Sequence, residues 1–340
     1  RQGVDVDFPS ELMIAAQKGD VGLARANLRD MGQIYKNRTA LMLATEHGSV
    51  ECIKLLLGEL AIQNSMGETA LVLAAKKGYV DCISLLHAEG NLTYSEYDKF
   101  SDGALVSGLT PLMASIRNGQ RHCIHEFQYL LKRQASNGTT SLMYAVMGEL
   151  DSCVPYLVDE CRIVDNLGES ALMKAVNGPS LQVVEFLSKY EGGIQDTDGR
   201  TALLRAVQNR NVTYVKAMLR IQKQSSERDI GLAANDGTTL FTAAIKSGFE
   251  DLIYLLNAED MSASKNLRSG ARSINVQNIQ QSGSVIKLEG PNEDANLHCS
   301  VQHTPQQKQT LAERLQAVNN SLASTQPSIS KELMDKYQQD

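Results

Sequence analysis

Apolar residues recur in two groups along residues 10–260, and each pair of groups follows a Thr or a Ser. Leu or Phe stands two residues after this start and Ala usually stands five after it, as Leu41 and Ala44 do after Thr39. A second group occupies the thirteenth, fourteenth and seventeenth positions after the start. In the second copy, this group consists of Cys52, Ile53 and Leu56. Such spacings line one side of a helix, so the pattern predicts two short helices in each copy.

The copies repeat with a base period of about 30 residues, which is within the range of stacked repeat architectures. They start near residues 10, 39, 69, 110, 140, 170, 201 and 239, and successive starts differ by 29, 30, 41, 30, 30, 31 and 38 residues. The Thr or Ser at each start is predicted to cap the first helix with its side-chain oxygen. A Gly or Asn about nine residues later is predicted to end that helix in a left-handed conformation. The residues expected in that role are Gly19, Gly48, Gly78, Gly119, Gly148, Gly178, Asn209, Asn211 and Gly248.

Turn residues separate most copies, as in Asn64–Gly67 and Asp165–Gly168. Together with Thr-Pro-Leu at Thr110 and Thr-Ala-Leu at Thr39, Thr69 and Thr201, these features resemble the ankyrin repeat over residues 10–260. The resemblance implies an all-α solenoid of about eight helix-turn-helix repeats with short turns. A tetratricopeptide array is disfavoured, since its period is about 34 residues and its aromatic positions are missing here.

The chain departs from the family pattern at one position. The family's His, three residues after the start, is absent from every copy, and Met, Val, Leu or Thr replaces it. We expect thioether packing to take the place of the Thr–His hydrogen bond. The repeats resemble in particular the Met-containing Thr-Ala-Leu-Met repeats of ankyrin-rich proteins that some parasitic protists have in large numbers. Some of those proteins carry a protein kinase ahead of the repeats.

The chain is predicted to divide into a lead-in at 1–9, a repeat array at 10–260, a disordered polar segment at 261–309 and a short amphipathic helix with a tail at 310–340. Ser, Asn and Gln dominate after the array, and such a composition cannot bury enough apolar surface to fold. The helix could lie on a surface or begin a coiled coil, and two to three heptads are too few to decide; we favour the surface helix.

Two insertions interrupt the array. About 11 extra residues fall within 91–108, where they form either a disordered bulge or part of a binding surface; we favour the bulge. Eight extra residues fall within 220–236, and their polar character predicts solvation.

Composition narrows the choice of partner and compartment. The apolar fraction is 42%, aromatic residues are 5%, and Trp is absent, so the core must be aliphatic and small. The net charge is −6 and no basic block exceeds two or three residues, which argues against nucleic acid and anionic membranes as partners. No run of 18 apolar residues occurs, which argues against membrane insertion. Six scattered cysteines without a disulfide pattern indicate a reducing compartment.

The sequence contains no recognised catalytic motif. Phosphate loops, zinc-protease motifs, hydrolase elbows and the protein-kinase set are all missing from residues 1–340. The strongest metal candidate is His122-Cys123-x-His125 with Cys153. Because Cys123 and Cys153 occupy the same repeat position as Cys52, we interpret them as core residues rather than zinc ligands. No third group is suggested that would orient a Cys123–His122 nucleophile pair. We therefore predict no catalytic residue, metal, cofactor or small-molecule substrate.

In ankyrin proteins the concave face typically binds other proteins, and the resemblance implies the same here. The side chains expected to face a partner lie one residue before each start and seven and eight residues after it. They include Arg38, Glu46, His47, Glu68, Lys76, Lys77, Arg117, Asn118, Arg200 and Gln208.

The sequence is compatible with two main functions. The first is a non-enzymatic, intracellular scaffold or adaptor in the cytoplasm, with association with the cytoskeleton as one option. The second is the regulatory or targeting region of a larger enzyme, for which a protein kinase is the leading candidate. A ubiquitin-ligase adaptor is a weaker third hypothesis, since no receptor-box motif supports it.

Overall fold

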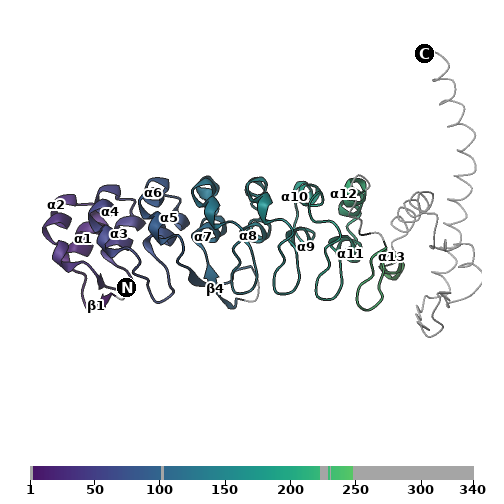
Figure 1. The fold of residues 1–340 in the computed structure, drawn as a ribbon, viewed down its shortest axis with the longest axis horizontal. Helices are drawn as coiled ribbons and strands as arrows, with labels where there is room; N and C mark the ends of the chain where they lie inside the picture. Colours follow the sequence, from purple (N-terminus) through teal and green to yellow (C-terminus); the bar gives the residue numbers. More distant parts are fainter. Residues whose placement is uncertain (1–2, 101–102, 223–228, 230, 248–340) are drawn as a thin grey trace, which may run out of the picture. The chain divides into compact units, whose positions relative to one another are not determined.

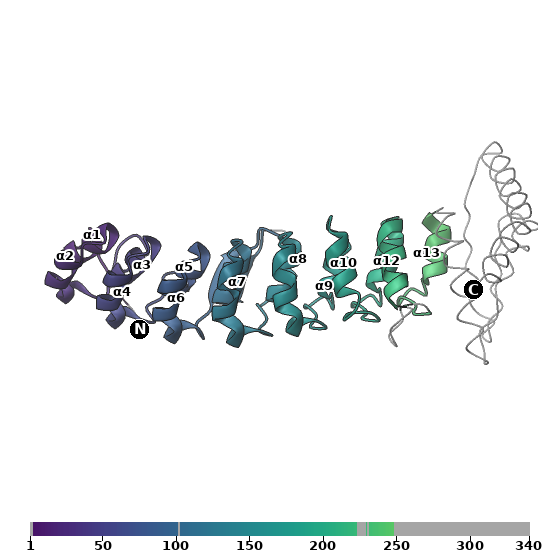
Figure 2. The same cartoon turned by 90° about the horizontal axis from the view of Figure 1, so that it is seen from above.

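Helix pairs follow one another in chain order in the computed structural model (Figures 1 and 2). The structure describes residues 3–100, 103–222, 229 and 231–247, which all belong to one unit at 1–266. The expectations for residues 261–340, including the amphipathic helix, lie outside the described residues.

The first helices of the copies form one row and the second helices form another (Figure 1). The first helices are α1 (Glu11–Lys18), α3 (Ala40–Glu46), α5 (Ala70–Lys77), α7 (Pro111–Arg117), α8 (Ser141–Met147), α9 (Ala171–Ala175), α11 (Ala202–Gln208) and α13 (Leu240–Ser247). The second helices are α2 (Val21–Ala26), α4 (Val50–Leu56), α6 (Val80–Leu86), η4 (Arg121–Leu130), η5 (Asp151–Glu160), α10 (Leu181–Leu187) and α12 (Val212–Gln222).

Two of the second elements are 3₁₀ helices rather than α-helices. The elements η4 and η5 each contain a break, at Phe127 and Leu157 respectively. In η5, Pro155 removes a backbone donor, which disfavours a continuous α-helix. Short 3₁₀ turns also follow the second helices of the first three copies: η1 (Leu28–Asp30), η2 (Leu57–Glu59) and η3 (His87–Glu89).

The predicted helix caps are confirmed. In every copy the hydroxyl of the starting residue accepts a hydrogen bond from the backbone N–H three residues later; in the fourth copy this bond joins Thr110 to Met113 at 3.3 Å. Satisfying these donors, which have no partner within the helix, stabilises a helix start by about 0.5–2 kcal/mol. The capping residues are Ser10, Thr39, Thr69, Thr110, Thr140, Ser170, Thr201 and Thr239.

The left-handed helix ends follow position more closely than residue type. Gly19, Gly48, Gly78 and Gly119 have positive φ as predicted, and all four lie nine residues after the start. For Gly148 and Asn209 the prediction was wrong, because the next residues, Glu149 and Arg210, adopt the positive φ instead. Those two residues also lie nine after the start. Gly178 is not left-handed either, and Pro179, at the ninth position, cannot adopt a positive φ. Asn211, the other candidate in the seventh copy, is not in that conformation, and Gly248 lies outside the described residues.

One aliphatic core runs through the stacked copies. From the second copy to the seventh, the residues thirteen, fourteen and seventeen after the start are buried, whereas Leu23 of the first copy is only partly buried. The Met residues that replace the family His are at most 1% exposed. Cys52, Cys82, Cys123 and Cys153 are each at most 1% exposed and are reduced, which agrees with their interpretation as core residues.

The described residues of the insertion, 91–100 and 103–108, form an antiparallel hairpin, so the expectation of a disordered bulge was wrong. Strands β3 (Tyr94–Tyr97) and β4 (Leu105–Leu109) pair with a register shift between Tyr94 and Glu96. Tyr94, Val106 and Leu109 are buried, and this apolar anchorage explains the order. A second pairing is parallel and joins β1 (Val4–Asp5) to β2 (Gln33–Ile34).

Candidate functional site

The turns between copies project from the ends of the first helices (Figure 1). Each of these turns is here called a finger. In three fingers an Asn or Asp side-chain oxygen accepts hydrogen bonds from two backbone N–H groups, and these residues are Asn64, Asp165 and Asp196. In the finger before the third copy, Asn64 accepts from Met66 at 3.0 Å and from Glu68 at 2.9 Å. Gln63 then donates to the Thr93 carbonyl in the next finger at 3.0 Å. The fingers and the ends of the first helices form a continuous surface, here called the finger face.

Ion pairs link the second, third and fourth copies along this face. Arg38 contacts Glu46 at 2.7 Å and Glu68 at 3.6 Å, and Glu68 contacts Lys76 at 2.7 Å. Lys76 also contacts Glu96, on β3 of the inserted hairpin, at 3.1 Å. Burial alone would raise the pKa of Glu68, but the hydrogen bond and charge of Lys76 hold it below its ordinary value. These charges are therefore largely neutralised by one another.

Arg117 lies beneath the hairpin rather than on the surface. Its side chain is 1% exposed, and its Nη1 contacts Asp98 at 3.2 Å while its Nε contacts Glu96 at 3.3 Å. The guanidinium carbon lies 4.7 Å from the ring centre of Tyr144 and 5.4 Å from that of Phe100. Arg117 thus anchors the hairpin, and its expected exposure to a partner was wrong.

A second set of ion pairs lies on the sixth and seventh copies. Lys174 contacts Asp165 at 2.6 Å and also pairs with Glu169. Arg205 contacts Glu169 at 2.6 Å and Asp196 at 2.5 Å. Burial alone would raise the pKa of Glu169, but hydrogen bonds and charge from Lys174 and Arg205 hold it below its ordinary value. Burial alone would raise the pKa of Asp196, but the hydrogen bond and charge of Arg205 together with backbone hydrogen bonds from Arg200 and Asp198 lower it.

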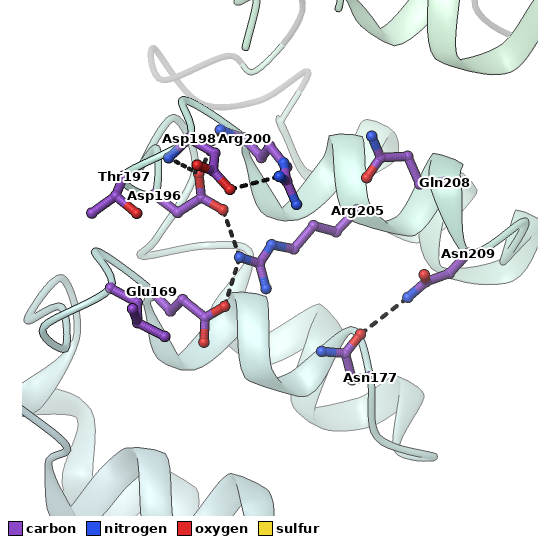
Figure 3. A pocket seen from close by; sticks show the side chains of 10 residues that line it. Glu169, Asn177, Asp196, Thr197, Asp198, Arg200, Arg205, Gln208 and Asn209 are labelled. Atoms are coloured by element: carbon purple, nitrogen blue, oxygen red, sulfur yellow. Dashed lines mark hydrogen bonds and ion pairs between the residues drawn. The ribbon is translucent and has the colours of Figure 1, made fainter. Parts of the chain in front are cut away.

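An open pocket of about 320 Å³ lies beside this second set (Figure 3). The fingers at 165–169 and 196–200 form one side, and the ends of α9 and α11 form the other. Glu169, Asp196 and Arg205 lie on its charged side. At the opposite side, Asn209 donates a hydrogen bond to Asn177 at 3.1 Å, and Gln208 lies nearby.

Comparison with known protein families agrees with this architecture. A family model described as ankyrin repeats (3 copies) matches residues 12–98, 89–166 and 151–229. The chain belongs to the ankyrin repeat family. Ankyrin repeats are protein–protein interaction modules and are not themselves catalytic. A search of curated proteins found no match to the chain.

The ankyrin array places most of the predicted contact residues on the finger face but in unequal environments. His47, Lys77, Asn118 and Gln208 have exposed side chains. Arg200 is half-buried and pairs with Asp198 at 2.6 Å. The others, namely Arg38, Glu46, Glu68, Lys76 and Arg117, belong to the chain of ion pairs described above.

A recurring buried glutamate joins neighbouring ankyrin copies, and it was not predicted. Glu89 accepts from the backbone N–H of Leu71 at 2.8 Å and of Ala61 at 2.8 Å. Glu59, Glu160 and Glu191 make the equivalent pairs of bonds. Burial raises the pKa of each, although the backbone hydrogen bonds act in the opposite direction. The sequence contains a pattern that could have predicted this role, because a Glu recurs at nearly the same interval after four of the starts.

The cysteine and histidine chemistry considered from the sequence finds no geometric support in the described part of the chain. Burial raises the pKa of Cys123 to about 11, so its thiol stays protonated near neutral pH and is a poor nucleophile. His122 is held by the Gly78 carbonyl, with Nε2 at 2.8 Å. Among the described residues, no group of three or more His, Cys, Asp or Glu is placed to hold a metal ion. No described helix combines the length and apolar character that crossing a bilayer requires.

Proposed function

We propose that the chain is a non-enzymatic scaffold or adaptor that binds a partner protein on its finger face. The observation that carries this proposal is that most charged side chains of the finger face pair with one another, while other polar side chains are exposed. Buried or half-buried ion pairs fix the fingers to the first helices, whereas His47, Lys77, Asn118 and Gln208 extend into solvent. A surface whose supporting side chains are already ordered loses less conformational entropy when a partner binds.

The regulatory or targeting region of a larger enzyme, with a protein kinase as the leading candidate, remains the alternative. It would use the same finger face, so the array itself favours neither. A glycine-rich loop and a His-Arg-Asp sequence encoded upstream of Arg1 would support the kinase alternative, and sequencing of the complete transcript tests this. A cytoplasmic location is part of the proposal, and microscopy of the tagged protein tests it.

Quantitative affinity capture from native lysate tests the binding surface. The variant H47A/K77A/N118A removes three exposed side chains at the C-terminal ends of α3, α5 and α7 without altering an ion pair. A matched control, E51A/K54A, removes an exposed pair from α4, in the row of second helices. We expect the finger-face variant to capture at least about fivefold less of the partner protein than the wild type and the control do. Equal capture by all three forms, or equal loss in both variants, would contradict the proposal.

A further inference from the structure

The pocket between the sixth and seventh copies has charges that are already paired. Arg205 lies between Glu169 and Asp196, and Arg200 pairs with Asp198. These lining residues comprise two cations and three carboxylates, so the net charge is about −1. An anionic ligand would meet excess negative charge, and a cationic ligand would have to compete with Arg205. Recognition in this pocket therefore relies on neutral polar groups.

Those neutral groups are side-chain amides. In their mutual hydrogen bond, Asn209 uses one N–H of its amide and Asn177 uses its oxygen (Figure 3). The Asn177 amide nitrogen and the Asn209 oxygen can therefore bind a ligand. Gln208 has no hydrogen-bond partner among the described residues, and all three side chains are exposed. Together they offer both donors and acceptors, as the N–H and C=O groups of a peptide main chain require.

The rim adds an apolar contact. Leu167, at the tip of one finger, is 61% exposed and also lines the pocket. An uncharged side chain next to the bound main chain can cover Leu167, and burial of apolar surface favours that contact.

The second and third copies lack this arrangement. There, Lys76 stands at the end of the first helix in the position that Gln208 has in the seventh copy, and it pairs with Glu68 and Glu96. At this position of the third copy, charged groups that satisfy one another therefore replace the amide.

We infer that this pocket binds the main chain of an extended, uncharged peptide segment through Asn177, Gln208 and Asn209. The inference rests on the proposed function, because it assigns part of the partner's chemistry to one place on the finger face.

Selection from a random library of linear 12-residue peptides, displayed on phage and applied to the immobilised full-length chain, tests the inference. Synthetic copies of the selected peptides are then measured by fluorescence anisotropy. N177A/N209A and Q208A alter the pocket, H47A and K77A alter the finger face outside the pocket, and E51A/K54A on α4 is the matched control. We expect selected peptides that lack charged residues in their centre. Their affinity should fall about tenfold in each pocket variant, as for the loss of one or two hydrogen bonds, and stay unchanged in E51A/K54A.

Each other result has a distinct meaning. Peptides that lose affinity in H47A or K77A but not in the pocket variants would overturn the inference and leave the proposed function standing. Tighter binding of a phosphorylated library would also overturn the inference alone. Selected peptides that are insensitive to every finger-face variant would overturn both. Unchanged thermal unfolding curves for the variants, whose altered side chains are exposed, show that any loss reflects binding.

Discussion

Glu89 provides the sharpest test of how neighbouring copies hold together. Its carboxylate is 1% exposed and accepts from Leu71 in its own copy and from Ala61 in the copy before. The variant E89A removes both acceptors. A buried donor left without an acceptor costs about 1–3 kcal/mol, and Ala61 is only half-buried, so the combined loss should be about 2–4 kcal/mol.

The variant E89Q refines this test. An amide retains one oxygen acceptor but turns an NH2 group towards the other donor, so about 1–3 kcal/mol should be lost. The control E51A removes a carboxylate that is 65% exposed and paired with Lys54, and its effect should stay below about 0.5 kcal/mol.

Urea unfolding of the full-length chain, followed by far-ultraviolet circular dichroism, gives the free energy of unfolding for each form. Copies in a repeat array contact only their neighbours, so a weakened boundary should also broaden the transition and lower its slope. An E89A protein as stable as E51A would refute the assigned role of Glu89. An E89Q protein less stable than E89A would refute the hydrogen-bond reasoning.

Four further outcomes follow from the structure. In urea unfolding, R117A should lose about 3–5 kcal/mol because its carboxylate partners stay partly or fully buried, whereas K77A should lose less than about 0.5 kcal/mol. L86A should lose about 2–5 kcal/mol by the same measurement, and a loss below about 0.5 would show that this helix side is misassigned. The folded-state pKa of Glu169 lies below its ordinary 4.5, so its stabilisation is complete above that pH and is lost as the pH falls through the folded-state value. In acid titrations from about pH 5 to pH 3, E169Q should therefore lose less stability than the wild type, and a larger loss would contradict the sign. Mass spectrometry after iodoacetamide treatment at neutral pH should find Cys123 unmodified in the folded protein and modified in urea; rapid labelling of the folded form would contradict its burial.

Local chemistry explains why much of the fold could be predicted. A cap such as Thr110 acts on a backbone N–H three residues away, and the apolar side of a helix depends on spacings within one or two turns. Both are visible in a single copy, and eight copies in phase reinforce them. The position of the left-handed residue was harder to assign, since Glu149 adopts that conformation without being a Gly or an Asn.

The candidate site could be predicted only in part. Sequence position places Glu68 and Lys76 on the finger face, but not that they contact each other at 2.7 Å. Arg117 is charged and ends a helix, which favours exposure, yet the hairpin 20 residues before it covers it. From the sequence alone Glu89 would be assigned to the solvent-exposed surface, but the stacked copies bury it.

The sequence by itself determined the repeat period, the caps at the helix starts and the aliphatic core, because each depends on residues close together along the chain. The tertiary structure decided which charges neutralise one another, how the inserted hairpin folds and where free amides form a pocket. Those features depend on distances between copies, and Coulomb and hydrogen-bond energies change steeply over a few ångströms.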